Sequence, residues 1–133
     1  MKKLGLVMAT IVAGCGLFDS SSSSSDGVES VTLSAVNSSG ETGTATLTDL
    51  GDSTTQVAIT TTGGTDTGVQ STIVRTGTCG SSGAIYAQLN NIQSRQSITT
   101  LSYALSSLIG GKYYIDVHSS TSVGEIVACG SIP

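Results

Sequence analysis

The chain has 133 residues, enough for one small domain, and 38% of them are hydrophobic, which excludes a protein that is disordered throughout. Charged residues make up only 11% and aromatic residues 4%, with no tryptophan, so neither long salt-bridged helices nor a core of large rings is expected, while 17 glycines suit short strands and tight turns. The formal net charge of −4 excludes a surface that attracts nucleic acid.

Residues 1–14 form the first predicted element, a secretory signal. A basic start is followed by an apolar run at residues 4–12, which is too short for a membrane span of about 20 residues. The run ends in Val12-Ala13-Gly14-Cys15, which resembles a bacterial lipobox. This resemblance implies cleavage before Cys15, transfer of a diacylglyceryl group to its thiol and acylation of the new amine. The alternative, an ordinary signal followed by a chance cysteine, leaves the position of Cys15 unexplained.

Cleavage at this point predicts a lipid-anchored protein of the bacterial cell envelope. Two or three acyl chains, at about 0.8 kcal/mol per buried CH₂, hold a protein on a membrane stably where one chain is marginal. Cleavage of the signal removes two of the five basic residues. Three basic residues then remain against nine acidic residues, a formal charge of −6. The lipid must therefore supply the membrane affinity, and no nucleic-acid partner is expected. Gly16, in place of an aspartate after the lipidated cysteine, favours the outer membrane over the inner membrane.

Residues 15–27 are predicted to be a linker that begins with the lipidated cysteine. Its second half contains an unbroken run of serine at residues 20–25. This composition has nothing to bury and little backbone preference, and about nine such residues span about 15–18 Å. We therefore expect a flexible tether that holds a folded domain, residues 28–133, away from the membrane.

From Val28 onward the chain breaks into short runs of alternating or β-branched residues separated by Gly, Asn, Asp and Ser, a pattern typical of an all-β sandwich or barrel. Within residues 31–35 and 44–48, apolar and polar side chains alternate, so one face should pack inward and the other should meet water. Eight strands are predicted, at residues 28–36, 43–50, 56–62, 69–76, 84–89, 97–103, 112–118 and 125–131.

The connections carry three further predictions. Leu101, Leu105 and Leu108 are spaced by four and three residues, which allows a short helical turn before Gly110 and Gly111 without favouring one. Residues 63–68 look at first like a phosphate loop, but no lysine partner and no helix follow, so they are interpreted as a hairpin turn. Residues 49–52 form another turn, with too few oxygen ligands in sight for calcium.

Cys79 and Cys129 remain as a pair once Cys15 carries lipid. In an oxidising compartment such a pair predicts a disulfide. It would close a loop of about 50 residues and stabilise the domain by about 4 kcal/mol in the chain-entropy model. Two free thiols are the alternative. A redox or metal role is disfavoured, because the cysteines lie far apart in sequence and no further Cys or second His accompanies them.

Three motifs in the C-terminal half, GTC at residues 77–79, YYIDVHSS at 113–120 and EIVACGSI at 125–132, resemble the copper-zinc superoxide dismutase fold family and small exported CHRD-like proteins. In that family a cysteine after the metal-binding strand pairs with the cysteine of a C-terminal Ala-Cys-Gly motif, and a strand that ends in Val-His supplies a copper ligand. The resemblance covers residues 28–133, with specific motifs only after Gly77. It implies an eight-stranded Greek-key β-sandwich with a Cys79–Cys129 disulfide and with His118 at the copper position.

The departures from that family bear on function. Its His-x-His pair falls at Ile73-Val74-Arg75, and its superoxide-guiding arginine falls at Ile126. His118 is the only histidine in the chain. One imidazole with distant carboxylates neither holds copper tightly nor tunes its potential. We therefore predict no metal, no cofactor and no catalytic residue, and interpret His118 as a strand-end residue that hydrogen-bonds a neighbouring loop. A single residual metal ligand at His118 is the alternative.

Other chemistry finds little support in the sequence. Asp116 and His118 with one of many serines suggest a hydrolase triad, but the two residues are two apart on one strand and no Gly-x-Ser-x-Gly elbow is present. Arg75 is expected to pair with Glu125 or Asp116 in a solvated contact of little energetic weight.

The sequence thus predicts a non-catalytic lipoprotein domain, a disulfide-pinned sandwich that binds an envelope protein or a cell-wall partner or simply occupies surface. The rival hypothesis is a metal-binding or residual oxidoreductase protein in which His118 and groups from elsewhere hold copper. A third hypothesis, self-association of the threonine-rich strands by edge pairing, stays open.

Overall fold

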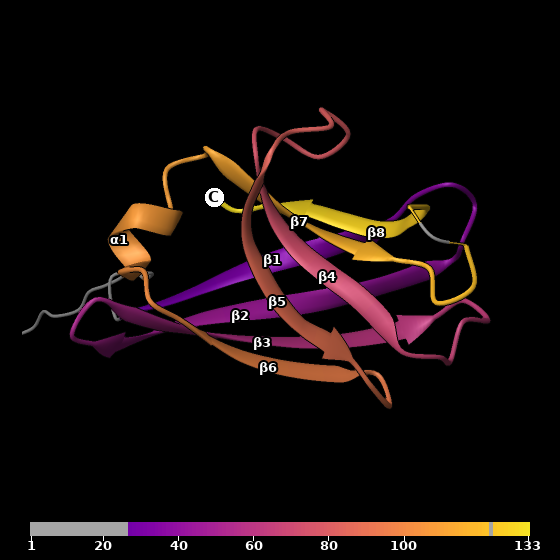
Figure 1. Ribbon diagram of the computed structural model, residues 1–133, viewed down its shortest axis with the longest axis horizontal. Coiled ribbons are helices and arrows are strands. Elements are labelled where there is room, and N and C mark those ends of the chain that lie inside the picture. The colour runs from indigo at the N-terminus through magenta and orange to yellow at the C-terminus, as the bar shows by residue number, and fades with distance from the viewer. Residues whose placement is uncertain (1–26, 123) are drawn as a thin grey trace, which may run out of the picture.

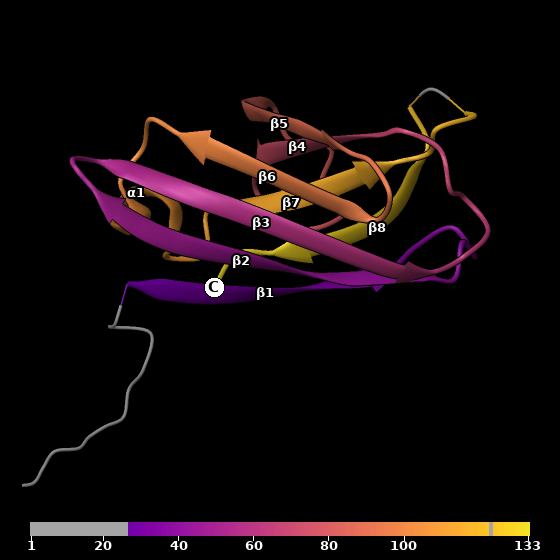
Figure 2. The same cartoon turned by 90° about the horizontal axis from the view of Figure 1, so that it is seen from below.

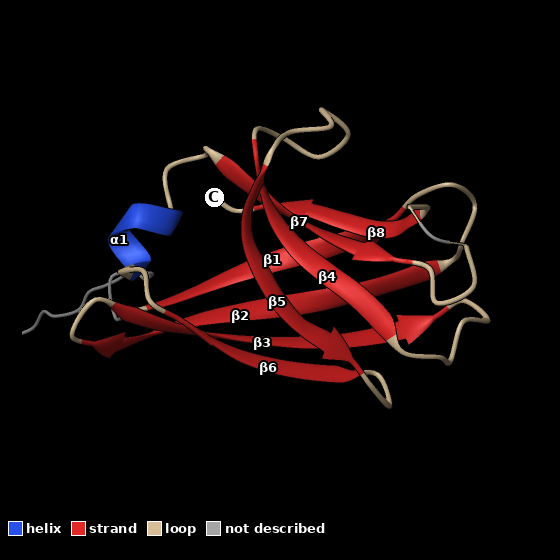
Figure 3. Ribbon diagram, viewed as in Figure 1, coloured by secondary structure: helices blue, strands red, loops and turns tan. Residues whose placement is uncertain are grey.

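Short alternating segments fold the chain into strands almost throughout the part that the computed structural model describes, residues 27–122 and 124–133 (Figure 3). All eight predicted strands are confirmed, with boundaries shifted by a few residues. The strands are β1 (Val28–Ala35), β2 (Glu41–Gly51), β3 (Thr54–Gly63), β4 (Gln70–Thr76), β5 (Ile85–Ile92), β6 (Gln96–Leu101), β7 (Tyr113–His118) and β8 (Ile126–Ser131). The helical turn that the leucine spacing allows is present as α1 (Leu105–Leu108), whose Leu105 and Leu108 are buried.

The strands form one antiparallel sheet in the order β5-β4-β7-β8-β1-β2-β3-β6, which folds over on itself (Figures 1 and 2). We call β1, β2, β3 and β6 the first layer and β4, β5, β7 and β8 the second layer. β1 links the layers, because its residues from Val28 to Leu33 pair with β2, whereas Ser34 and Ala35 pair with β8. The result is a nearly closed, sandwich-like all-β fold.

Asn90 of β5 joins the two ends of this sheet order. Its backbone N–H donates to Oγ1 of Thr99 on β6 at 2.8 Å, and its side-chain amide donates to the carbonyl oxygen of Ile98 at 2.7 Å. The carbonyl oxygen of Asn90 accepts from the hydroxyl of Ser97 at 2.7 Å. These bonds occupy backbone groups that an edge strand would otherwise present to another chain.

The core lies between the layers and is aliphatic, as the scarcity of aromatic residues predicts. Leu33 and Leu47 from the first layer and Ile115 and Val117 from the second are almost completely buried. Three of the four tyrosines sit at the margin of this core near α1, where the ring centroids of Tyr86 and Tyr113 are 4.3 Å apart. The side chains that point inward from each strand therefore supply the hydrophobic stabilisation.

The interpretation of residues 63–68 as a hairpin turn is wrong. β3 pairs with β2 and β6, whereas β4 pairs with β5 and β7, so this segment carries the chain from one layer to the other. Asp66 organises it by accepting hydrogen bonds from the backbone N–H groups of Gly68, at 3.0 Å, and Ser120, at 2.7 Å. A glycine-rich connection resembles a hairpin in sequence because both need positive backbone φ angles, as at Gly63 and Gly64.

The predicted signal, the lipid site at Cys15 and nearly all of the tether lie outside the described residues. Within the described ranges, no helix has the length and apolar character needed to cross a membrane.

Candidate functional site

Several residues that the sequence analysis named, Arg75, Asp116, His118 and the two disulfide cysteines, lie together on the outer surface of the second layer. Ile73 and Arg75 of β4 point outward there, whereas Val74 between them points into the core. The strand register sets Ile73 opposite Asp116 of β7, and Asp116 in turn opposite Cys129 of β8. Arg75, Asp116, His118 and the disulfide therefore belong to one face.

Arg75 and Asp116 form the central ion pair of this face. Nε of Arg75 donates to Oδ2 of Asp116 at 2.7 Å, and Nη1 of the same guanidinium donates to the carbonyl oxygen of Gly83 at 3.0 Å. Of the two predicted partners, Asp116 is therefore the actual one, and Glu125 is not. The expected solvated contact is wrong, because the Asp116 side chain has no exposed surface, whereas that of Arg75 is 21% exposed.

The carboxylate of Asp116 can accept more hydrogen bonds than its neighbours donate. Its Oδ1 is buried and has no hydrogen-bond partner among the described residues. Burial raises the pKa of Asp116 above its usual 3.8, and the hydrogen bond and positive charge of Arg75 offset only part of this rise. The guanidinium thus favours the ionised form of a carboxylate that burial disfavours.

His118 ends β7, as predicted, and its side chain is nearly buried. Its Nε2 lies 3.9 Å from Oδ2 of Asp116, too far for a hydrogen bond, and the described part of the chain offers this atom no other partner. The predicted hydrogen bond to a loop is therefore not found for Nε2. Burial lowers the pKa of His118 below its usual 6.5; the Asp116 carboxylate raises it and the Arg75 charge lowers it further.

The donor set at this face suits a cation poorly. In residues 27–122 and 124–133, no three His, Cys, Asp or Glu side chains come close enough together to hold a metal ion. At His118 the donors are one imidazole and one carboxylate, and the guanidinium of Arg75 binds the oxygen of that carboxylate nearest the imidazole. A copper site needs several ligands in a fixed geometry, and a fixed positive charge opposes a cation.

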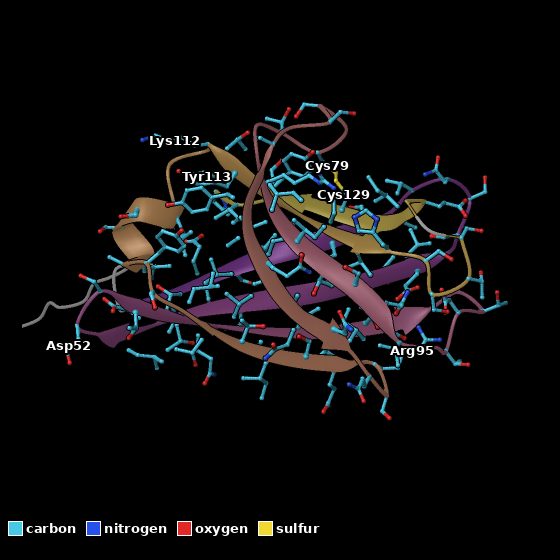
Figure 4. All side chains as sticks on the ribbon, viewed as in Figure 1. Asp52, Cys79, Arg95, Lys112, Tyr113 and Cys129 are labelled. Carbon is cyan, nitrogen blue, oxygen red and sulfur yellow. A yellow bond between two sulfur atoms is a disulfide. The ribbon has the colours of Figure 1, made fainter. Side chains whose placement is uncertain are left out.

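The predicted disulfide between Cys79 and Cys129 is confirmed, with Cα atoms 5.8 Å apart (Figure 4). It pins the β4–β5 connection, residues 77–84, over the outer surface of the second layer. There the backbone N–H of Gly83 donates to the hydroxyl of Tyr114 at 3.0 Å, and Tyr114 is fully buried although it points away from the core. Strand alternation alone would place that ring in solvent, so its burial could not be predicted from the local pattern.

Two depressions open beside these residues. One of about 370 Å³ is lined by His118, Ile73, Ser71 and Asn91. The other, of about 450 Å³, lies at the loop end of the sandwich and is lined by hydroxyl and carboxylate residues that include Glu41 and Asp66. The sequence analysis did not single out Glu41, which is buried; its Oε1 accepts from the side-chain amide of Gln70 at 2.9 Å, and its Oε2 lies 3.9 Å from Nη1 of Arg95.

The chain matches no protein-family model, no curated protein and no solved structure.

What this face can do chemically follows from its contacts. The Asp116 carboxylate is bound by Arg75, and Nε2 of His118 makes no hydrogen bond to a hydroxyl or to any other group in the described part of the chain. The Arg75 guanidinium thus links β4 to Asp116 of β7 and to Gly83 in the disulfide-pinned segment.

Proposed function

We propose that this chain is a lipid-anchored protein of the bacterial cell envelope whose disulfide-pinned β-sandwich acts as a binding or structural module and not as an enzyme. The observation that carries the proposal is the Arg75–Asp116 ion pair, which occupies the place where the resemblance to copper-zinc superoxide dismutases would require copper ligands. A buried carboxylate committed to a guanidinium is a structural element of the second layer.

The same resemblance supports a Greek-key superoxide dismutase-like sandwich as the fold. Eight antiparallel strands, a Val-His end on β7 and a disulfide between the β4–β5 connection and β8 agree with what that family would have. The ligand positions differ, with Ile73 and Arg75 in place of two histidines. We infer a descendant of a metal-site fold that kept the framework and lost the metal.

The experiment is intact-mass analysis of the membrane-extracted protein, with and without reduction and alkylation, together with metal analysis of the same sample. We expect a diacyl or triacyl adduct on Cys15, alkylation of Cys79 and Cys129 only after reduction, and copper and zinc far below one per chain. An unlipidated, soluble product would contradict the anchor, whereas stoichiometric metal would contradict the metal-free module.

A second function has a specific observation in its favour. Nε2 of His118 and Oδ1 of Asp116 are both buried without hydrogen-bond partners among the described residues. A copper-binding or residual oxidoreductase protein would use His118 as one ligand. Metal that copurifies with the wild-type chain and is lost in His118→Ala would establish that alternative.

A further inference from the structure

The two cysteines of the disulfide differ in their access to solvent. Cys79 lies in the disulfide-pinned segment, residues 77–84, and is exposed, whereas Cys129 on β8 is only 3% exposed. Figure 4 shows the disulfide between this segment and β8. A thiolate attacks a disulfide at one sulfur and expels the other, so access decides which sulfur is attacked. In the folded chain the sulfur of Cys79 is therefore the one open to attack.

A depression of about 230 Å³ borders the disulfide. Both cysteines line it, together with Val36, Asn37, Gly80 and Ile126. None of these side chains carries a charge, so nothing in the lining repels an anionic thiolate. The side chains of Val36 and Ile126 are apolar, and they suit the carbon chain that carries a thiol. The depression therefore leads an aliphatic thiol to the disulfide.

Hydrogen bonds hold both ends of the disulfide-pinned segment independently of the disulfide. The N–H of Gly77 donates to the carbonyl oxygen of Lys112 at 2.7 Å. The N–H of Gly83 donates to the hydroxyl of Tyr114 at 3.0 Å, and the carbonyl oxygen of Gly83 accepts from Nη1 of Arg75 at 3.0 Å. Opening of the disulfide should therefore free the middle of the segment while its ends stay on the second layer. Exchange at Cys79 then does not require the domain to unfold.

We propose that Cys79 is a site of covalent modification by aliphatic thiols, which reach it through the depression and expel Cys129. The incoming thiolate forms a bond to Sγ of Cys79 as the bond between the two cysteine sulfurs breaks, and the electron pair of that bond goes to Cys129. The incoming sulfur is oxidised to the disulfide level, and Cys129 is reduced. Cys129 then takes a proton from water, because a bare thiolate would be buried opposite the Asp116 carboxylate.

The position of Cys129 favours a lasting product. A mixed disulfide reverts when the expelled sulfur attacks it again as a thiolate. Protonation of Cys129 slows this return, so the thiol compound stays on Cys79. Distance along the chain counted against a redox role for this pair, but exchange depends on access to sulfur in the folded protein. The inference goes beyond the proposed function, because it requires the disulfide and the fold and not the lipid anchor.

The test exposes the membrane-extracted, oxidised chain in mild detergent to glutathione at about pH 8, where a useful fraction of a thiol is ionised. Iodoacetamide then blocks free thiols, and peptide mass analysis assigns the adduct on each cysteine. We expect glutathione on Cys79 with carbamidomethyl on Cys129, in about tenfold excess over the reverse assignment. In denaturant, where both sulfurs are open, the two assignments should be similarly frequent.

Asn37→Asp tests the route, because it places a carboxylate in the depression. It should slow modification of Cys79 by about threefold at low salt, and added salt should reduce the effect. Asn37→Ala loses the same hydrogen bond to the carbonyl oxygen of Ile126 but adds no charge, so it should not slow the reaction. Asn91→Asp adds the charge beside the other depression, next to His118, and should react as the wild type does. Circular dichroism and melting verify the fold of each variant.

Glutathione found mainly on Cys129, an adduct that forms only in denaturant, or equal rates for Asn37→Asp and the wild type would overturn the inference. A peptide with one cysteine between apolar residues is tested alongside. Faster modification by the peptide would support exchange with a protein cysteine, and faster modification by glutathione would support exchange with small thiols.

Failure of this inference can be told from failure of the proposed function. Free thiols at Cys79 and Cys129 before any thiol is added would contradict the disulfide-pinned module itself. An oxidised chain that resists exchange would leave the proposed function standing. An unlipidated chain or bound copper would contradict the proposed function without bearing on the exchange assay.

Discussion

Nε of Arg75 lies 2.7 Å from Oδ2 of Asp116, and the Asp116 side chain is completely shielded from solvent. Arg75→Met would leave a buried carboxylate with no cation, and removal of one partner of a buried pair costs about 3–5 kcal/mol. Because the Arg75 side chain is partly exposed, we expect a loss near the lower end of that range. The measurement is the free energy of unfolding from denaturant titration.

The double variant Arg75→Met/Asp116→Leu should recover most of this loss, because no uncompensated charge remains. Lys112→Met, which removes an exposed cation of the same chain, is the control and should change the free energy of unfolding by less than about 0.5 kcal/mol. Equal effects at positions 75 and 112 would refute a structural role for the buried pair.

The disulfide should hold the β4–β5 connection against the second layer. Cys79→Ser/Cys129→Ala removes the cross-link between two residues that are 50 apart in the sequence. Because the unfolded chain is then less restricted, the free energy of unfolding should fall by about 4 kcal/mol. Reduced wild-type protein should unfold at the same denaturant concentration as the double variant. If reduction leaves the midpoint unchanged, the bond does not constrain the domain.

The lowered pKa of His118 predicts how the stability of the domain changes with pH. Its folded pKa lies below the usual 6.5, so the unfolded chain binds more protons, and the contribution of His118 to stability is complete above pH 6.5 and is lost as the pH falls through the folded pKa. The groups that face it are Asp116 on its own strand and Arg75 on β4. The raised pKa of Asp116 acts in the opposite sense, since its contribution declines as the pH rises above 3.8.

The measurement is the melting temperature between about pH 7.5 and about pH 5.5, the interval in which histidine changes charge. The wild type should lose stability on acidification, and His118→Gln should show a flatter profile. A variant profile parallel to that of the wild type would mean that another group is responsible.

Asn90 should stabilise the closure between β5 and β6. Asn90→Ala removes the side-chain hydrogen bond to the carbonyl oxygen of Ile98 and should lower the free energy of unfolding by about 0.5–1.5 kcal/mol. Asn91→Ala is the matched control, because no hydrogen bond of the Asn91 side chain is found in the described part of the chain. The carbonyl oxygen of Ile98, which loses its donor in Asn90→Ala, should also promote some association by strand pairing, visible in sedimentation velocity. Absence of both effects would contradict the closure.

Local pattern was enough to predict the strands and the disulfide. The strands follow from the period of two in segments such as residues 31–35 and 44–48, because successive side chains on a strand point to opposite faces. Cys79 and Cys129 could be paired by counting, since Cys15 was assigned to the lipid. The spacing of the leucines allowed the turn around Leu105 and Leu108 without favouring it. Each of these inferences depends on neighbours in sequence or on composition.

The tertiary structure decided which segments meet across the fold. Residues 63–68 cross between layers instead of turning back, because the partners of β4 are β5 and β7, which come later in the chain. The burial of Asp116 and Tyr114 on the outer surface depends on Arg75 and on the segment that the disulfide folds over them. The row of Thr32, Thr44 and Thr60 likewise exists only through the register of β1, β2 and β3. Pairing between distant segments leaves no local period in the sequence, so these contacts could be known only from the folded chain.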